Sequence, residues 1–333
     1  MMDENKLQLL EDSYHRSIDY LRISITDMCN LRCIYCRPWK EIGKKSHQEI
    51  LRYEEIVRLT SLMAQLGIKR IRVTGGEPLI KKDVLPLIEE LAKIELLEEV
   101  SLTTNATKLA HFAGQLKKAG VNRINISLDS LNKDRYAQIT GGGNLNDVIT
   151  GIEEALRVGL DPLKINMVVM KGINDDELEE FALLTLNKHL QVRFIEFMPI
   201  GQQKISWAER YLPTSVLKER LASFFGLIPT NGLPGNGPAE YYQIKGASGR
   251  IGFISPISNH FCSKCNRIRL TPDGHLRLCL GKEMEVDLKW PLRQGASDEE
   301  LKELIVQAMR NKPKGHQFHL KELGGRQMVA IGG

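Results

Sequence analysis

The sequence predicts an α/β protein: an incomplete (β/α)6 barrel of the TIM type, followed by a C-terminal α+β extension. Two observations lead to this fold class. Six strand-like runs alternate with segments of helical periodicity up to residue 198, which indicates a parallel sheet. One face of several runs is polar, whereas a closed barrel fills its centre with branched apolar side chains. The 333 residues suffice for about two domains, which we place at 1–200 and 201–333.

The predicted strands and helices follow one another regularly. The strands cover residues 21–26, 69–75, 99–105, 123–129, 163–169 and 192–198. The helices between them cover residues 54–66, 84–94, 109–119, 145–158 and 176–188. Three of these helices end at Gly67, Gly120 and Gly159, because glycine readily adopts the left-handed conformation that ends a helix.

Polar side chains repeat at every second position of the first four strands. Successive residues of a strand face opposite sides of the sheet, so these side chains share one face. They are Arg22, Ser24 and Thr26; Arg70, Arg72 and Thr74; Ser101, Thr103 and Asn105; and Asn125, Ser127 and Asp129. Parallel sheets are usually apolar on both faces. We predict that the polar face surrounds a polar ligand inside the barrel; a sheet open to water on one side is the alternative.

Beyond residue 198 the alternation of strands and helices stops. The pattern predicts a helix at 214–225, a glycine- and proline-rich linker, short strands at 241–244 and 250–254, and a helix at 298–309. A basic, glycine-rich tail follows. Because apolar segments are scarce in this part of the chain, we expect the extension to pack across the barrel rather than fold alone.

The composition argues against a membrane span and a secretory leader. The longest uncharged stretch, 221–239, contains three prolines and four glycines, and residues 1–16 mix acids and bases without an apolar core. We therefore expect a cytoplasmic protein. The net charge of +5 favours anionic partners without selecting one of them.

The six cysteines fall into two tight groups of three, Cys29, Cys33 and Cys36, then Cys262, Cys265 and Cys279. In a reducing compartment such cysteines are more often metal ligands than disulfides, so two metal sites are predicted. The first group starts just beyond the first strand, at the end where α/β barrels place their chemistry. Three thiolates would leave one iron of a 4Fe–4S cluster open to a small molecule. Zinc completed by His47, or three unrelated cysteines, is the alternative.

The Cys-x3-Cys-x2-Cys spacing, with the aromatic Tyr35 before the last cysteine, resembles that of the radical S-adenosylmethionine enzymes. The resemblance implies that the open iron binds the amino and carboxylate groups of S-adenosylmethionine, whose reductive cleavage yields a 5′-deoxyadenosyl radical. The sequence Gly75-Gly76-Glu77-Pro78 resembles the motif that receives the methionine amino group in these enzymes. On its own it would be only a turn signal.

The second cysteine group lies beside two arginines. Arg267 and Arg269 would share one face of a strand, which is an anion-binding arrangement next to the metal. Only three thiols lie together here as well, and His260 or His275 could complete a zinc site. An open iron beside two guanidinium groups suits a polar, anionic substrate, and we favour this interpretation.

Nearly the whole chain resembles the GTP 3′,8-cyclase family of radical S-adenosylmethionine lyases. The resemblance implies a second 4Fe–4S cluster that binds the guanine of GTP through its open iron. The radical would abstract the ribose 3′ hydrogen, and the carbon radical so formed would attack carbon 8 of guanine. The product would be (8S)-3′,8-cyclo-7,8-dihydroguanosine 5′-triphosphate, made in the first step of molybdenum cofactor (molybdopterin) biosynthesis.

The resemblance also implies roles for individual residues. The catalytic set would be Cys29, Cys33, Cys36, Arg267 and Arg269. S-adenosylmethionine would be bound by Tyr35, Gly76, Glu77, Ser127 and Met198. GTP would be bound by Arg22, Arg72, Thr103, Lys164, Arg267, Ile268 and Arg269. All six cysteines would be metal ligands. Several members of these sets belong to the polar face that the strand alternation had already turned inward.

The same resemblance implies further partners. They are a low-potential electron donor of the flavodoxin or ferredoxin type, the next pathway enzyme, which forms cyclic pyranopterin monophosphate, and a second copy of the chain in a homodimer. The tail ends in Ile331-Gly332-Gly333, as in this family, where the diglycine end reaches into the active site. Gly324-Gly325-Arg326 would add flexibility and a cation, and a frayed terminus is the alternative.

Two residues depart from the family pattern, and two other functions compete with the cyclase. Arg37 follows the third cysteine and Ala106 follows Asn105, where methionine and glycine are usual, and neither change removes a ligand.

A radical S-adenosylmethionine enzyme that modifies peptides with an auxiliary cluster would leave Arg22, Arg72 and Lys164 poorly explained. A zinc-stabilised nucleic-acid-binding protein would need interleaved aromatic residues, which make up only 6% of the chain. We therefore expect neither nucleic acid nor membrane as a partner.

Overall fold

The core of the fold is a curved sheet whose first six strands are parallel and adjacent in chain order. The computed structural model describes residues 10–36, 45–46, 48–201, 203–231, 237–318 and 325–332. The strands are β1 (Tyr20–Ser24), β2 (Arg70–Thr74), β3 (Glu99–Thr104), β4 (Arg123–Ser127), β5 (Leu163–Val169) and β6 (Leu190–Glu196). Each lies within two residues of its predicted bounds, and the predicted fold class, a partial TIM-like barrel, is confirmed.

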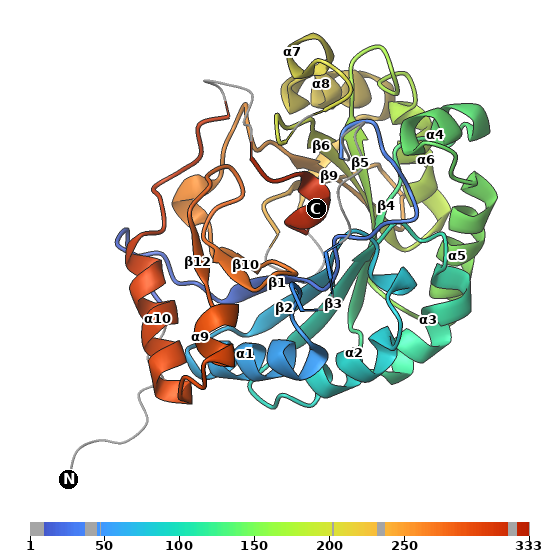
Figure 1. Ribbon diagram of the computed structural model, residues 1–333. Helices are drawn as coiled ribbons and strands as arrows, with labels where there is room; N and C mark the ends of the chain where they lie inside the picture. Colours follow the sequence, from blue (N-terminus) through green and yellow to red (C-terminus); the bar gives the residue numbers. More distant parts are fainter. Residues whose placement is uncertain are drawn as a thin grey trace.

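Helices cover the outer face of this sheet (Figure 1). The predicted ones are α1 (Tyr53–Gln65), α2 (Val84–Ala92), α3 (Leu109–Lys118), α5 (Leu145–Arg157) and α6 (Leu178–Asn187). The sequence analysis missed α4 (Lys133–Thr140) and the short 3-10 turn η1 (Pro78–Ile80). Helix α4 is short and polar, so it has no clear apolar period, and it begins at Asn132, whose side chain accepts hydrogen bonds from two main-chain nitrogens.

The C-terminal extension lengthens the sheet at both of its edges. Strand β10 (Arg267–Leu270) pairs in parallel with β1, and β9 (Arg250–Ile254) pairs in parallel with β6. Beyond them come the antiparallel strands β11 (His275–Arg277), β12 (Glu285–Asp287), β8 (Glu240–Gln243) and β7 (Ile228–Thr230). Within the described ranges, the two ends of this 12-stranded sheet do not pair with each other, so the barrel is open there. The division at residue 200 stays a prediction.

The remaining helices are short or peripheral. They are α7 (Trp207–Arg210), α8 (Thr214–Phe225), α9 (Lys289–Arg293), α10 (Asp298–Arg310) and the 3-10 turns η2 (Cys262–Lys264) and η3 (Met328–Ala330). Helix α10 begins with a capping box, in which Ser297 and Glu300 each accept a hydrogen bond from the other's main-chain nitrogen. The chain after α10 returns to the centre of the barrel (Figure 1).

The main hydrophobic core lies between the sheet and the outer helices. Ile23, Ile71, Leu102, Ile126 and Ile165 occupy the outward-facing positions of five neighbouring strands, and all are fully buried. The alternate positions of the same strands face inward. The alternation along each strand therefore determines both which residues join the hydrophobic core and which line the interior of the barrel.

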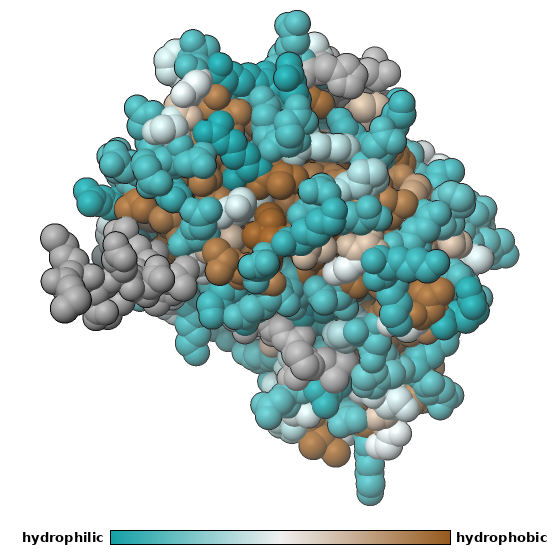
Figure 2. All heavy atoms as spheres, turned by 90° about the horizontal axis from the view of Figure 1, so that it is seen from below, coloured by the Kyte–Doolittle hydropathy of each residue, from teal (hydrophilic) through white to brown (hydrophobic). Residues whose placement is uncertain are grey.

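One face of the molecule is mostly hydrophilic (Figure 2). The face in Figure 2 carries hydrophilic side chains with small hydrophobic areas between them. Among the residues that the structure describes, none of the helices combines the length and the apolar character that crossing a membrane requires.

Candidate active site

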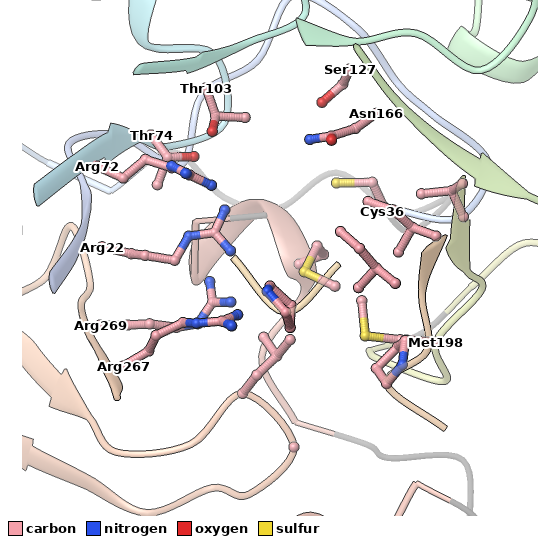
Figure 3. A pocket seen from close by; sticks show the side chains of 18 of the residues that line it. Arg22, Cys36, Arg72, Thr74, Thr103, Ser127, Asn166, Met198, Arg267 and Arg269 are labelled. Carbon is pink, nitrogen blue, oxygen red and sulfur yellow. The ribbon is translucent and has the colours of Figure 1, made fainter. Parts of the chain in front are cut away.

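One large cavity fills the interior of the open barrel. Its lining includes all six cysteines and the inward-facing residues of β1 to β6 and β10. In Figure 3 four arginines, Arg22, Arg72, Arg267 and Arg269, lie on one side of this space, and Cys36 and Met198 lie on the other. The strand alternation therefore predicted correctly that the interior is polar.

Three guanidinium groups stand in one row across neighbouring strands. The strand register places Arg22 beside Arg269 of β10 on one side and beside Arg72 of β2 on the other. Burial, with repulsion from Arg269 and Arg72, holds the pKa of Arg22 well below its usual range. Burial and the neighbouring Arg267 and Arg277 lower the pKa of Arg269 to about 9. These groups repel one another, so an anion placed between them would be strongly attracted.

A second set of cations lies deeper, on β4 to β6. Lys164 is only 2% exposed, and burial together with Arg193, Arg123 and Arg72 lowers its pKa to about 6. Arg193 donates a hydrogen bond to the Asn125 side chain at 2.6 Å, and burial lowers the pKa of this arginine to about 10. Among the described residues, the cavity lining includes eight Lys or Arg side chains and two carboxylates, Asp129 and Glu196. Such an excess of buried cations suits a polyanion.

The first cysteine group sits on a loop that follows β1. Main-chain nitrogens of Arg32 and Ile34 donate to carbonyls of Thr140 and Ile139, so the end of the unpredicted helix α4 holds this loop. The hydroxyl of Tyr35 donates to Asp129 at 2.6 Å. Burial, followed by the nearby Cys36, Asp129 and Cys29, raises the pKa of Cys33 well above its usual range. The three thiols thus lie close enough to influence one another.

The two glycines after β2 pack against the main chain that leads to Cys29. A Cβ atom on Gly75 would lie 2.7 Å from the Thr26 carbonyl oxygen, and one on Gly76 would overlap with the Met28 carbonyl. The Gly76 nitrogen also donates to the Thr26 oxygen at 2.6 Å. The glycines therefore permit close contact between two loops, in addition to lining the cavity.

Replacing Gly76 by alanine should lower the free energy of unfolding by about 1–3 kcal/mol, because the new methyl group meets rigid main chain. The loop that carries Cys29 must then shift, so we also expect less iron bound after anaerobic reconstitution. Denaturant unfolding of the apoprotein and iron analysis measure the two effects. Gly114→Ala on α3 is the matched control, since no atom lies within 4 Å of its added Cβ; equal stability of the two variants would contradict the expectation.

Two predicted site residues play other parts in the structure. Glu77 is 1% exposed and does not line the cavity; its carboxylate accepts hydrogen bonds from Thr104 Oγ1 at 2.7 Å and from the main-chain nitrogen of Asn105 at 2.6 Å. It therefore ties the β3 loop to the loop after β2. Ile268 borders the cavity, but its side chain belongs to the hydrophobic core, because alternate residues of β10 face opposite sides.

The second cysteine group lies on the turn η2 and on the loop after β11. The Cys265 nitrogen donates to the Cys262 carbonyl at 3.2 Å. Burial alone would raise the pKa of Cys265, but Lys312 and Arg267 outweigh it and leave this pKa below its usual value. His260 and His275, the ligands of the zinc alternative, do not line the cavity, and His47 lies outside the described residues.

The donor chemistry of both groups fits iron–sulfur clusters. Each group brings three thiols to the same cavity, and thiolates are the usual ligands of 4Fe–4S clusters. Within the described ranges, no three His, Cys, Asp or Glu side chains converge closely enough to hold a single metal ion.

The C-terminal tail enters the cavity. Arg269 Nη1 donates to the carbonyl oxygens of Ile331 at 3.0 Å and Gly332 at 2.6 Å. Farther back, Arg326 contacts Asp273 at 2.8 Å and Glu285 at 2.8 Å.

Gly324 and Gly333 lie outside the described residues, as does Arg37. Ala106, the other departure, has a φ of 62°, a left-handed conformation that costs alanine about 1–2 kcal/mol and glycine little.

The cavity residues that the sequence analysis did not single out include Arg123, Asn166, Arg193 and Arg277. Arg123 stands two positions before Asn125 and four before Ser127, so the alternation along this strand already predicted that its side chain faces inward. Arg193 is hidden among apolar residues of β6. Arg277 belongs to a strand of three residues, which is too short to show a period.

Comparison with known proteins agrees with this geometry. Residues 23–185 match the Radical SAM superfamily, and residues 190–318 match the family described as Molybdenum Cofactor Synthesis C. The partial barrel and the match to this superfamily define the chain as a radical S-adenosylmethionine protein, which implies a 4Fe–4S cluster and S-adenosylmethionine. Among solved structures, Streptococcus suis SuiB bound to precursor peptide SuiA has a TM-score of 0.60 at 14% identity, covering 90% of this chain and 67% of that one. At such identity the likeness shows the fold alone.

Curated relatives narrow the family. A GTP 3′,8-cyclase of Thermodesulfovibrio yellowstonii is 49% identical over 327 residues, covering 97% of this chain and 100% of the relative. One of Moorella thermoacetica is 49% identical over 324 residues, and one of Petrotoga mobilis is 48% identical over 323 residues, each with at least 97% of both chains covered. The chain belongs to the GTP 3′,8-cyclase family.

Proposed function

We propose that this chain converts GTP to (8S)-3′,8-cyclo-7,8-dihydroguanosine 5′-triphosphate, the first step of molybdenum cofactor biosynthesis. The observation that carries the proposal is the shared cavity: two groups of three cysteines and eight cationic side chains line one interior space. The full-length similarity to GTP 3′,8-cyclases supports the same function.

At the first group, the chain's part is to hold a cluster and to orient S-adenosylmethionine. Cys29, Cys33 and Cys36 would ligate the cluster, and Tyr35, Gly76, Ser127 and Met198 line the adjoining part of the cavity. When bound, this cluster and S-adenosylmethionine together supply a 5′-deoxyadenosyl radical. The contribution of the protein is positioning, because a radical must meet one carbon–hydrogen bond and be kept from water.

At the other side, the chain's part is to hold GTP. Arg22, Arg72 and Lys164 would bind the triphosphate, joined by Arg123 and Arg193, which share the inner face of the sheet. Thr103, on β3, lines the same cavity. Arg267 and Arg269 would then lie beside the base and ribose, next to Cys262, Cys265 and Cys279, which would hold the second cluster. Guanidinium groups bind phosphate oxygens in pairs and keep their charge, which suits this task.

The competing functions explain fewer of the contacts. A peptide-modifying enzyme shares the fold, and SuiB was solved with a peptide, but a peptide has no need of five cations lining the cavity from β1 to β6. A nucleic-acid-binding protein would carry its cations on the surface, whereas Lys164, Arg123 and Arg193 are buried inside the barrel.

The function is tested by incubating the anaerobically reconstituted, reduced protein with S-adenosylmethionine, with and without GTP. We expect 5′-deoxyadenosine and a cyclised GTP product only when GTP is present. 5′-Deoxyadenosine formed at the same rate in both samples, with no cyclised product, would contradict the proposal. ATP is the control, since it offers the same triphosphate with a different base.

Binding of GTP should take up protons at Lys164. With a pKa of about 6, this side chain is mostly neutral at neutral pH, and a triphosphate beside it raises the pKa. GTP affinity should therefore fall as the pH rises above about 7.5, where the phosphates are already ionised, by less than about tenfold per pH unit. Calorimetry in buffers of different ionisation enthalpy measures the uptake. Lys164→Met should remove it, and uptake that persists in this variant would contradict the assignment.

Three further partners stay predictions from the family resemblance. They are a low-potential electron donor of the flavodoxin or ferredoxin type, an enzyme that forms cyclic pyranopterin monophosphate from the product, and a second copy of the chain in a homodimer. The second cluster is likewise part of the proposal. Its support is the set of three thiols and the two arginines of β10 that border the same cavity.

A further inference from the structure

Three buried cations contact the second cysteine group, and one of them, Arg277, also lines the cavity. Arg16 Nη1 donates to the Cys262 carbonyl oxygen at 2.7 Å. Lys312 Nζ lies 3.8 Å from Cys265 Sγ, within hydrogen-bond range for sulfur. Arg277 Nε donates to the Cys279 carbonyl oxygen at 3.1 Å. Each cysteine of the group thus has its own cation, although the three cations come from distant parts of the sequence.

Arg16 joins the N-terminal segment to this site. Its side chain is 7% exposed and forms an ion pair with the buried Asp12 at 2.6 Å. The same Nη1 also donates to the carbonyl oxygen of Lys314 at 2.9 Å, and Nη2 donates to that of Pro313 at 2.7 Å. One guanidinium therefore connects the segment before β1, the cysteine turn η2 and the chain after α10.

Lys312 is the more unusual of the three. It is 3% exposed, and besides the sulfur it donates to the carbonyl oxygens of Arg267 at 2.8 Å and Leu278 at 2.6 Å. These carbonyls flank Cys265 and Cys279 in the sequence. A buried ammonium is costly unless negative charge is near. The thiolates of the second group supply that charge directly at its Nζ.

The surroundings of the first group differ. Cys29 Sγ accepts a hydrogen bond from the neutral amide of Asn105 at 3.8 Å, and the charged neighbour of Cys33 is the carboxylate of Asp129. A 4Fe–4S cluster on three thiolates is an anion, and reduction adds a further negative charge. Charge and hydrogen bonds near the sulfurs tune the potential of such clusters. The cations beside the second group would therefore raise the potential of a cluster held there.

We propose that Lys312, with Arg16 and Arg277, positions the thiolates of the second group and stabilises the reduced form of the cluster held there. This inference rests on the proposed function, because it requires a cluster at the second group. It predicts that the second cluster has the higher midpoint potential of the two and depends on Lys312 for its retention.

The test compares Lys312→Met with Lys314→Met, a matched control that removes the same charge from an exposed residue two positions away. Redox titration followed by electron paramagnetic resonance gives the midpoint potential of each cluster, and a chelator assay gives the rate of iron loss. In Lys312→Met we expect a lower midpoint potential for the second cluster only, and iron loss from it faster by about 10–100-fold. Lys314→Met should match the wild type.

A folded Lys312→Met protein with an unchanged midpoint potential and an unchanged rate of iron loss would overturn the inference. If this variant does not fold by circular dichroism, Lys312→Gln, which keeps a donor for the two carbonyls but no charge, decides by the same criteria. Lys312→Arg, which keeps the charge, should restore the potential. A wild-type protein that holds only one cluster would instead contradict the proposed function.

Discussion

Cys33→Ala is expected to abolish the reductive cleavage of S-adenosylmethionine. Cys33 is the middle thiol of the first group and lies in the cavity wall, close to Cys29 and Cys36. A 4Fe–4S cluster that leaves one iron open for S-adenosylmethionine needs three thiolates, and Cys33→Ala leaves only two of them. Loss of a direct ligand should cost more than the about 10–100-fold typical of outer partners. Chromatography of 5′-deoxyadenosine from the anaerobic, reduced protein measures the effect.

The same variant should keep the second cluster, because the two groups lie on different loops. Iron analysis should find about half of the wild-type iron, and the circular dichroism of the apoprotein should be unchanged. Wild-type rates of 5′-deoxyadenosine formation by Cys33→Ala would refute the assignment of the first group.

Cys262→Ala should have the opposite pattern. Cys262 lies on the turn η2, in the part of the cavity that contains Arg267 and Arg269. Without its thiolate the second cluster should be lost and GTP misplaced, while the first group is left intact. We expect 5′-deoxyadenosine formation to persist in uncoupled form, within about tenfold of the wild type, and cyclised GTP to disappear. Both products can be quantified in one reaction.

The comparison of the two cysteine variants is informative because each serves as the control for the other. Full cyclisation by Cys262→Ala would remove the second group from the site. Loss of S-adenosylmethionine cleavage to the same extent in both variants would show that the two groups do not act separately.

Much of the barrel could be predicted from the sequence because its strands are long enough to show a period of two. In β1 to β4 this period separates the core residues from inward-facing ones such as Arg22, Thr103 and Ser127. The cysteine spacing likewise drew attention to the loop after β1. Local patterns of this kind depend on the chain alone.

What the sequence could not predict depends on contacts between distant segments. Strands β10 to β12 have three or four residues each, and β10 forms because the edge of β1 is available to it. Glu77 belongs to a motif associated with a ligand, yet Thr104 and Asn105 use its carboxylate. Arg16 and Lys312 have no motif at all, and their position behind the second cysteine group follows only from the fold.

The central claim is that two separate clusters share one cavity, one for S-adenosylmethionine and one for GTP. Electron paramagnetic resonance of the anaerobic, reduced protein, titrated with each compound in turn, tests it most directly. We predict two 4Fe–4S signals, of which S-adenosylmethionine alters one and GTP alters the other. A single signal, or two signals of which the same one responds to both compounds, would contradict it.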